Sequence, residues 1–157
     1  MKDGEKETIV ILDNHEETLI WLSQIFEENG YNVNVATNLE QLMFCLEEEK
    51  TDLLVINFCC EVKKKKEIFL KVRGEERYFQ IPILGLFRDE PIEVIDLYLE
   101  LGVDHICTHP FSKKNIRIHA EQLIEAVQTR ELIDDLNQKN LFLERENAYL
   151  KGKMVRK

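Results

Sequence analysis

Polar side chains close two apolar runs of the sequence, and their chemistry is the first clue to function. Asp13 and Asn14 follow the run TIVIL at 8–12, and Asn57 ends the run LLVIN at 53–57. Carboxylate and amide oxygens can bind Mg²⁺, but the ion prefers anionic oxygen, and only Asp13 carries a formal charge here. The amide of Asn57 can act neither as a general base nor as a phosphoryl acceptor. These residues predict a polar site that is poorly equipped for phosphoryl or metal chemistry.

Apolar runs that alternate with helical patterns must position these side chains. The runs predict strands at 8–12, 31–36, 53–57, 81–87 and 105–109. Helical spacing of apolar residues predicts helices that begin near Glu16, Thr37, Lys66, Pro91 and Ser112. Almost continuously apolar strands separated by helices indicate a doubly wound α/β domain, with a five-stranded parallel sheet covered on both faces. Ligands of such domains bind outside the carboxyl ends of the strands, which adds Phe87 and His109 to the candidate site.

Local signals support the same division into elements. Gly30 ends the first helix in the manner of a C-cap glycine. The stretch Thr37-Asn38-Leu39-Glu40 has the form of a capping box, in which Thr37 and Glu40 would bond each other's backbone. Ser112 is a typical N-cap residue for the last helix.

Composition limits the class of protein. The chain has 157 residues, of which 44% are hydrophobic, and this suits one domain with a modest appendage. The net charge of −9 argues against nucleic-acid binding by this segment, because a nucleic-acid surface needs clustered basic charge. No segment approaches the roughly 18 apolar residues of a membrane span, and no signal-peptide pattern follows MKDGEKE. We expect a cytoplasmic protein without a membrane segment, in which residues 1–7 are disordered.

The cysteines and a run of lysines predict no special chemistry. Cys45, Cys59, Cys60 and Cys107 form no CxxC pair, and the adjacent two are too close for ordinary disulfide or zinc-ligand spacing. We expect reduced thiols that pack as small apolar side chains, with no metal and no cofactor. The lysines at 63–66 predict a solvated loop or a first helical turn.

Two further motifs complete an ordered set. They are the step from Gly102 to Asp104 and the sequence His109-Pro110-Phe111. Together with the order of the elements and the acidic position after the first strand, they resemble a CheY-like response-regulator receiver domain, over residues 8–127. The resemblance implies strand order 2-1-3-4-5. It also implies a pocket in which an aspartate accepts phosphate from a histidine kinase, carboxylates hold magnesium, and a hydroxyl and a lysine bind the phosphoryl oxygens.

This sequence keeps the usual residue at one of the five pocket positions. The positions are occupied by Asp13 (first acidic), Asn14 (second acidic), Asn57 (phospho-acceptor), Phe87 (hydroxyl) and His109 (lysine). An amide cannot form an acyl phosphate. Since two of the three carboxylate charges are gone, the site could remain stable without metal. The resemblance therefore implies a degenerate receiver, or pseudo-receiver, that is not an enzyme.

The resemblance carries two more expectations. The aromatic residue that switches with activation corresponds to Ile106, and the His109-Pro110 bond is expected to be cis. His109 could hydrogen-bond Asp13 and fill the place of the lysine. Alternatively, its imidazole beside that carboxylate could titrate near physiological pH and act as a pH sensor.

The last predicted helix continues beyond the receiver-like region, and we predict a coiled coil over residues 128–157. No proline or glycine occurs from Glu121 to Lys151. Apolar spacing of seven assigns heptad positions d (Leu136, Leu143, Leu150) and a (Ile133, Asn140, Asn147, Met154). Asparagine at position a favours paired helices in register, so we predict a parallel homodimer. The alternative is a helix that packs on its own domain.

Residues that flank the predicted seam bear on the register. Lys139 would face Glu144 of a partner helix, and Glu146 would face Lys151, which are attractive pairs in a parallel dimer. Leu141 and Phe142, outside the seam, could form a docking surface or indicate another register. The stretch ERENAYLK is similar to the linker that precedes the ATPase domain of NtrC-type transcription activators.

These features predict an atypical receiver domain of two-component-type signal transduction. It would act without phosphorylation, through dimerisation and contact with an unknown signalling partner, as the regulatory part of a transcription regulator. One alternative is a receiver that uses a different residue as phosphoacceptor. Another is a small-molecule-binding α/β domain, which is disfavoured because DNHEET, after the first strand, has no phosphate-binding glycine.

Overall fold

Strands and helices alternate along the chain in the computed structural model, which describes residues 5–58 and 65–155. The strands are β1 (Thr8–Leu12), β2 (Asn32–Ala36), β3 (Leu53–Asn57), β4 (Ile83–Phe87) and β5 (His105–Thr108). The helices are α1 (Glu16–Glu28), α2 (Leu39–Glu48), α3 (Lys65–Gly74), α4 (Ile92–Leu101) and α5 (Lys113–Val155). The predictions for Cys59, Cys60, Lys63 and Lys64 concern residues outside the described part.

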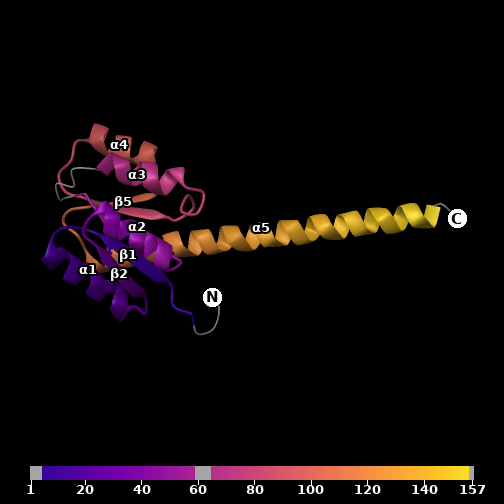
Figure 1. Cartoon of the computed structure of the whole chain (residues 1–157), viewed down its shortest axis with the longest axis horizontal. Helices are drawn as coiled ribbons and strands as arrows, with labels where there is room; N and C mark the ends of the chain where they lie inside the picture. Colours follow the sequence, from indigo (N-terminus) through magenta and orange to yellow (C-terminus); the bar gives the residue numbers. More distant parts are fainter. Residues whose placement is uncertain (1–4, 59–64, 156–157) are drawn as a thin grey trace. The chain divides into compact units, whose positions relative to one another are not determined.

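The strands form one parallel sheet in the order β2-β1-β3-β4-β5, which confirms the predicted doubly wound fold (Figure 1). Three strand ends differ from the prediction, and the first difference is that β2 begins at Asn32 and not at residue 31. The strand β4 begins at Ile83, after Pro82, because proline has no N–H for the ladder. The strand β5 ends at Thr108, although the backbone N–H of His109 still donates to the Phe87 carbonyl oxygen at 2.9 Å.

The register of the sheet brings the candidate residues to one edge. Leu12 of β1 pairs with Ile56 of β3, so Asp13 and Asn57 follow as neighbours. Asn57 in turn pairs with Leu86 of β4. All strands run in the same direction, so their carboxyl ends lie at the same edge of the sheet.

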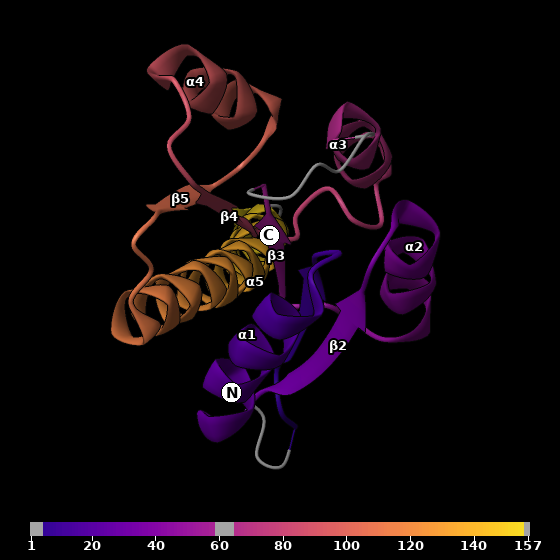
Figure 2. The same ribbon diagram turned by 90° about the vertical axis from the view of Figure 1, so that its left-hand side faces the viewer.

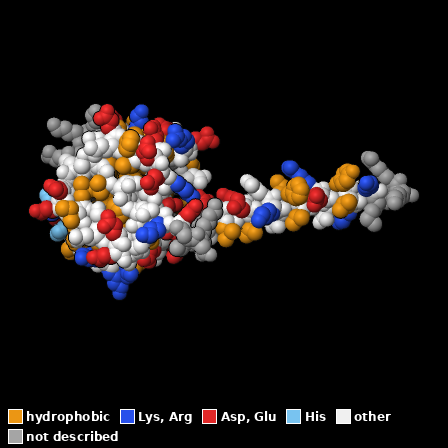
Figure 3. Space-filling model, turned by 60° about the horizontal axis from the view of Figure 1, so that its bottom comes forward, with side chains coloured by type: hydrophobic (Ala, Val, Ile, Leu, Met, Phe, Trp, Pro, Cys, Tyr) orange, Lys and Arg blue, Asp and Glu red, His pale blue; other side chains and the backbone are white. Residues whose placement is uncertain are grey.

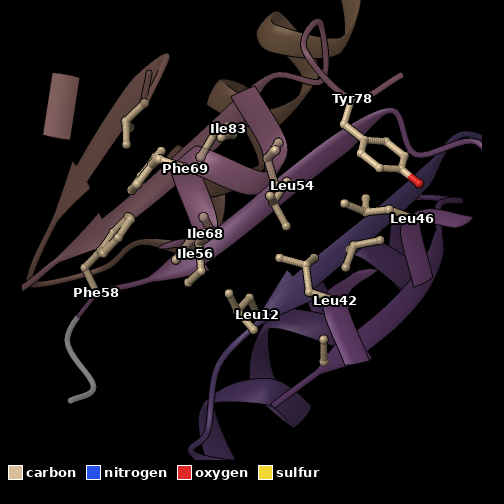
Figure 4. Packing of buried hydrophobic residues seen from close by; sticks show 14 of the residues in the cluster. Leu12, Leu42, Leu46, Leu54, Ile56, Phe58, Ile68, Phe69, Tyr78 and Ile83 are labelled. Carbon is tan, nitrogen blue, oxygen red and sulfur yellow. The ribbon is translucent and has the colours of Figure 1, made fainter. Parts of the chain in front are cut away.

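Helices cover both faces of the sheet, and each face has its own apolar core. Helix α1 and the first part of α5, up to Ile124, lie on one face, and α2, α3 and α4 lie on the other (Figure 2). The first core includes Leu22 and Phe26 of α1, both fully buried, with Ile116 of α5. The second core contains Leu42 of α2 and Ile68 of α3, packed as Figure 4 shows.

The caps confirm one prediction and correct another. Asn115 N–H donates to Ser112 Oγ at 3.3 Å, so Ser112 caps α5 as expected. The N-cap of α2 is Asn38 and not Thr37: Asn38 Oδ1 accepts from the backbone N–H of Gln41 at 2.8 Å. Gln41 Oε1 in turn accepts from the N–H of Thr37 at 2.8 Å. The expected pairing with Glu40 was wrong because the helix begins one residue later, which moves the third helical position to Gln41.

The chain divides into two compact units, Met1–Ile124 and Glu125–Lys157. Residues 1–7, which were expected to be disordered, end at Glu7. The carbonyl oxygen of Glu7 accepts from the backbone N–H of Asn32 at 2.9 Å, just before β1 begins. In the second unit, every residue from Thr129 to Lys153 is exposed. No helix among residues 5–58 and 65–155 combines the length and apolar character needed to cross a bilayer.

Arg73, near the end of α3, joins segments that are far apart in the sequence. Its guanidinium donates to the carbonyl oxygens of Gly102 (2.8 Å) and Ile81 (2.6 Å) and to Asp104 Oδ2 (2.9 Å). The same carboxylate oxygen of Asp104 accepts from the N–H of Ile83 at 2.8 Å. Burial lowers the pKa of Arg73, and the charge of Asp104 opposes that shift. The bridge holds α3, the loop before β4 and the loop before β5 together.

Replacing Arg73 tests this bridge. Arg73→Ala is expected to lower the free energy of unfolding by about 2–3 kcal/mol, because the carbonyl groups and Asp104 would lose their donor. Urea denaturation followed by circular dichroism measures the change. Lys71→Ala, at an exposed position of the same helix, is the control and should change stability by less than about 0.5 kcal/mol. Equal effects of the two substitutions would contradict the bridge.

Candidate functional site

A buried carboxylate and a buried amide meet at the carboxyl edge of the sheet. Asp13 is 0% exposed and Asn57 is 3% exposed. Asn57 Nδ2 donates to Asp13 Oδ2 at 2.8 Å, and the backbone N–H of His15 donates to Asp13 Oδ1 at 3.0 Å. Both carboxylate oxygens therefore accept a hydrogen bond from the protein. Such bonds compensate a buried charge that would otherwise be costly.

Asn14 is next to Asp13 in the sequence but does not join Asp13 and Asn57 in the buried pair. Asn14 follows Asp13 directly, and its side chain is exposed. The structure thus brings together the first acidic position and the position at the end of β3, and leaves Asn14 at the rim. The sequence had predicted that Asp13, Asn14 and Asn57 would lie at the ends of their strands. Which of the three side chains is buried depends on the path of the chain from β1 into α1.

Aromatic rings gather at the ends of β3 and β4. Phe87, at the end of β4, is fully buried and stacks on Phe58 with 4.6 Å between ring centroids. Tyr98 of α4 lies 4.6 Å from Phe58, and Phe69 of α3 lies 5.9 Å from it. We call Phe58, Phe69, Phe87 and Tyr98 the aromatic cluster. The prediction that Phe87 fills space included none of the other three rings, because they come from different elements.

Gly85 leaves room for the aromatic cluster. A Cβ atom at this position of β4 would lie 2.8 Å from a ring carbon of Phe87 and 3.1 Å from one of Phe58. Close packing of this kind leaves little freedom for side chains to move. Burial raises the pKa of the Tyr98 hydroxyl, so that group stays neutral. The side chains of Phe58, which follows Asn57, and of Phe87, at the end of β4, therefore lie in apolar surroundings.

His109 is placed differently from the expectation. Its imidazole is exposed and lies edge-on to Phe111, with ring centroids 5.5 Å apart. In the described part of the chain this ring makes no hydrogen bond to Asp13. The expected bond was wrong because Asn57 and the His15 backbone already donate to that carboxylate, whereas an exposed imidazole can be hydrated. The His109-Pro110 bond is cis, as expected.

Ile106 packs on the face of the sheet that carries the aromatic cluster. It is half-buried in β5, pairs with Gly85 of β4 and packs against the core cluster that contains Phe58 and Phe87. An aliphatic side chain at this place contacts the core on one side and solvent on the other.

Comparison with known proteins agrees with the fold. The chain is 28% identical over 116 residues to the alkaline phosphatase synthesis transcriptional regulatory protein PhoP of Bacillus subtilis, an alignment of 74% of this chain and 48% of that protein. The chain thus spans about half the length of this relative. No protein-family model matches the chain.

Solved structures show the same architecture. The signal receiver domain of a histidine kinase from Syntrophus aciditrophicus superposes with a TM-score of 0.69 and 21% identity, covering 77% of this chain and 92% of that one. NtrX from Brucella abortus gives a TM-score of 0.76 with 13% identity, covering 84% of this chain and 30% of that one. The chain therefore has the fold of a response-regulator receiver domain.

Restoring a carboxylate tests the polar pair. Asn57→Asp is expected to lower the free energy of unfolding at neutral pH by about 2–4 kcal/mol, because a donor 2.8 Å from Asp13 becomes a second buried negative charge. Repulsion and burial would raise the pKa of one of the two carboxyl groups. The deficit should therefore be present at neutral pH and shrink as the pH falls and the pair takes up a proton.

The matched control for this prediction is Asn14→Asp. It adds the same charge at the adjacent exposed position, so it should change stability by less than about 0.5 kcal/mol. Urea denaturation at several pH values, without divalent cations, compares the variants. A neutral effect of Asn57→Asp at all pH values would show that the amide does not stabilise the buried carboxylate.

Proposed function

We propose that the chain is a receiver domain of two-component-type signalling that works without aspartyl phosphorylation. The observation that supports this most is the hydrogen bond from Asn57 to Asp13. At the end of β3, a phosphorylatable receiver needs an anionic nucleophile. Here the side chain at that place is neutral, buried and already used as a donor to the neighbouring carboxylate.

The surroundings of the pair support the same proposal. Phosphoryl transfer depends on groups that stabilise the charge of the phosphoryl oxygens. At the end of β4 the side chain is the apolar ring of Phe87, stacked within the aromatic cluster. After β5 the side chain is His109, which is exposed and lies against Phe111. A phosphoryl group would thus meet ring carbons where a receiver offers a hydroxyl. We propose that this edge of the sheet is structural and that the chain is not an enzyme.

Signalling is proposed to proceed through a dimer formed by the second unit. The helical seam carries large apolar side chains that are half exposed, such as Ile133 (50%), Leu136 (50%) and Leu143 (54%). Figure 3 shows apolar side chains along this helix. An unpacked helix in water is of marginal stability, because most helical stability in proteins comes from packing of an apolar face. A second copy of the helix would supply that packing.

Polar residues of the helix support a parallel pair. Asn140 and Asn147 fall at position a between the leucines, where an asparagine pairs with its own copy and fixes the register. In this register Lys139 faces Glu144 of the partner. Asn140 and Asn147 would lower the stability of the dimer while excluding other oligomers. We propose that the arrangement of the two receiver units is read out by a protein partner.

The relatives suggest the context of this partner. PhoP of Bacillus subtilis, whose name describes a transcriptional regulatory protein, is aligned over 48% of its length. We propose that this chain has the corresponding place, as the regulatory part of a transcription regulator, with the coiled coil as its link to the output. Contact between proteins, and not binding to nucleic acid, is the role proposed for the acidic segment described here.

Exposure to a phosphodonor tests the loss of phosphorylation. After incubation of the full chain with acetyl phosphate and Mg²⁺, intact-mass spectrometry is expected to show no phosphoryl adduct, because an amide cannot form an acyl phosphate. A phosphorylatable receiver domain treated in parallel is the positive control. A stable adduct on the chain would overturn the proposal, and its position would identify an alternative acceptor residue.

Disrupting the heptad seam tests the dimer. Leu143→Lys is expected to convert the full chain from dimer to monomer at tens of micromolar, because it places a charge at the centre of the proposed seam. Gln138→Lys, one turn away at the outer heptad position f, adds the same charge and should leave the dimer intact. Light scattering coupled to size-exclusion chromatography measures the molar mass. A wild-type chain that is monomeric under these conditions would contradict the proposed dimer.

A further inference from the structure

Two histidines and a cysteine lie together between β5 and α5, on the face of the sheet opposite the aromatic cluster. His105 and Cys107 are two residues apart in β5, so their side chains point to the same face. Helix α5 packs on this face through Ile116 and contributes His119. One potential ligand atom from each of the two histidines and the cysteine lies within 4.8 Å of the other two.

The environment of His119 is unusual for a structural histidine. Its Nδ1 atom is buried and has no hydrogen-bond partner in the described part of the chain. A buried polar atom left without a partner is destabilising, because it has lost its hydrogen bonds to water. The ring stacks on that of His105 with 3.9 Å between centroids, an arrangement that would repel if both imidazoles were charged. Packing alone therefore gives no reason for imidazole at both positions.

We propose that His105, Cys107 and His119 form a site for Zn²⁺ or a chemically similar divalent transition metal. Imidazole nitrogen and thiolate sulfur are typical ligands of Zn²⁺, and three protein ligands leave the fourth tetrahedral position for water. In a tetrahedral zinc site the ligand atoms lie roughly 3.3–3.8 Å apart. The largest separation here must close by about 1 Å, which rotation of the two stacked rings can supply.

The protonation of the ligands is compatible with this proposal. Metal binding needs neutral imidazoles and a thiolate. Burial, with a smaller contribution from His119, lowers the pKa of His105 and keeps it neutral. Burial raises the pKa of Cys107 to about 11, so the thiol stays protonated until a metal binds. The thiol proton then passes to solvent as the bond between sulfur and metal forms.

A bound metal would have a defined mechanical effect. The strand β5 is at the edge of the sheet and pairs with β4 alone in the described sheet. The metal would crosslink this strand to α5, the helix that also contains the proposed dimer seam. The site itself does not depend on the proposed dimer, since its three residues belong to the first unit of one chain.

Metal titration of the full-length chain under reducing conditions tests the site. We expect one Zn²⁺ per chain, and we expect Co²⁺ to give the absorption of a thiolate-to-metal charge transfer. His105→Gln, Cys107→Ser and His119→Gln should each weaken Zn²⁺ binding at least about 100-fold, since loss of even an outer-shell partner of a metal ligand weakens binding about 10–100-fold. Cys107→Ser should in addition abolish the charge-transfer band.

Residues of the same types outside the cluster provide the controls. His15→Gln and Cys45→Ser remove an exposed histidine and a half-buried cysteine elsewhere in the first unit, and should leave the affinity and the band unchanged. Circular dichroism verifies the fold of every variant, and the two histidine substitutions are at half-buried positions. The proposal is overturned if the wild-type chain binds Zn²⁺ no more tightly than the three variants, or if the band survives in Cys107→Ser.

Discussion

The backbone and side chains of the central strands are buried on both sides, and the rest of the structure follows from that constraint. Every residue of β1, β3 and β4 is buried. Such strands need helices on both faces, and parallel strands need a crossover between them. The alternation of helices α1 to α5 with the strands satisfies both needs. A further consequence is that all strands end at one edge, where their final side chains become neighbours regardless of their separation in the sequence.

At that edge, the electrostatics differ from those of a cluster of carboxylates. Three carboxylates in one pocket repel one another and need a cation, whereas one carboxylate with an amide donor does not. The 2.8 Å hydrogen bond between Asn57 and Asp13 satisfies a charge that is completely buried. The aromatic cluster around Phe87 gathers at the ends of β3 and β4. Hydrogen bonds from the protein compensate the charge of Asp13, so apolar side chains can pack at the same edge of the sheet.

Helix α5 has a first part that packs on the sheet and a second part whose side chains are exposed. Its beginning packs on the sheet through Ile116 and Ala120 and places His119 beside β5. Its continuation in the second unit has exposed leucines at heptad spacing. A helix that is covered in one part and exposed in the other can be stable only if the exposed part has strong intrinsic propensity or a partner. The exposure of these leucines, more than their heptad spacing, is the physical reason for the proposed dimer.

The sequence by itself determined the strands, the helices and the edge at which Asp13 and Asn57 meet, because apolar periodicity reports burial directly and parallel strands share an edge. The strand order came from the resemblance of ordered motifs. Only the tertiary structure decided that His109 faces solvent, that Arg73 bridges two loops and that His119 reaches Cys107. These contacts join elements distant in the sequence through single side chains. No local spacing encodes such a contact, because its geometry arises only when the helices have packed on the sheet.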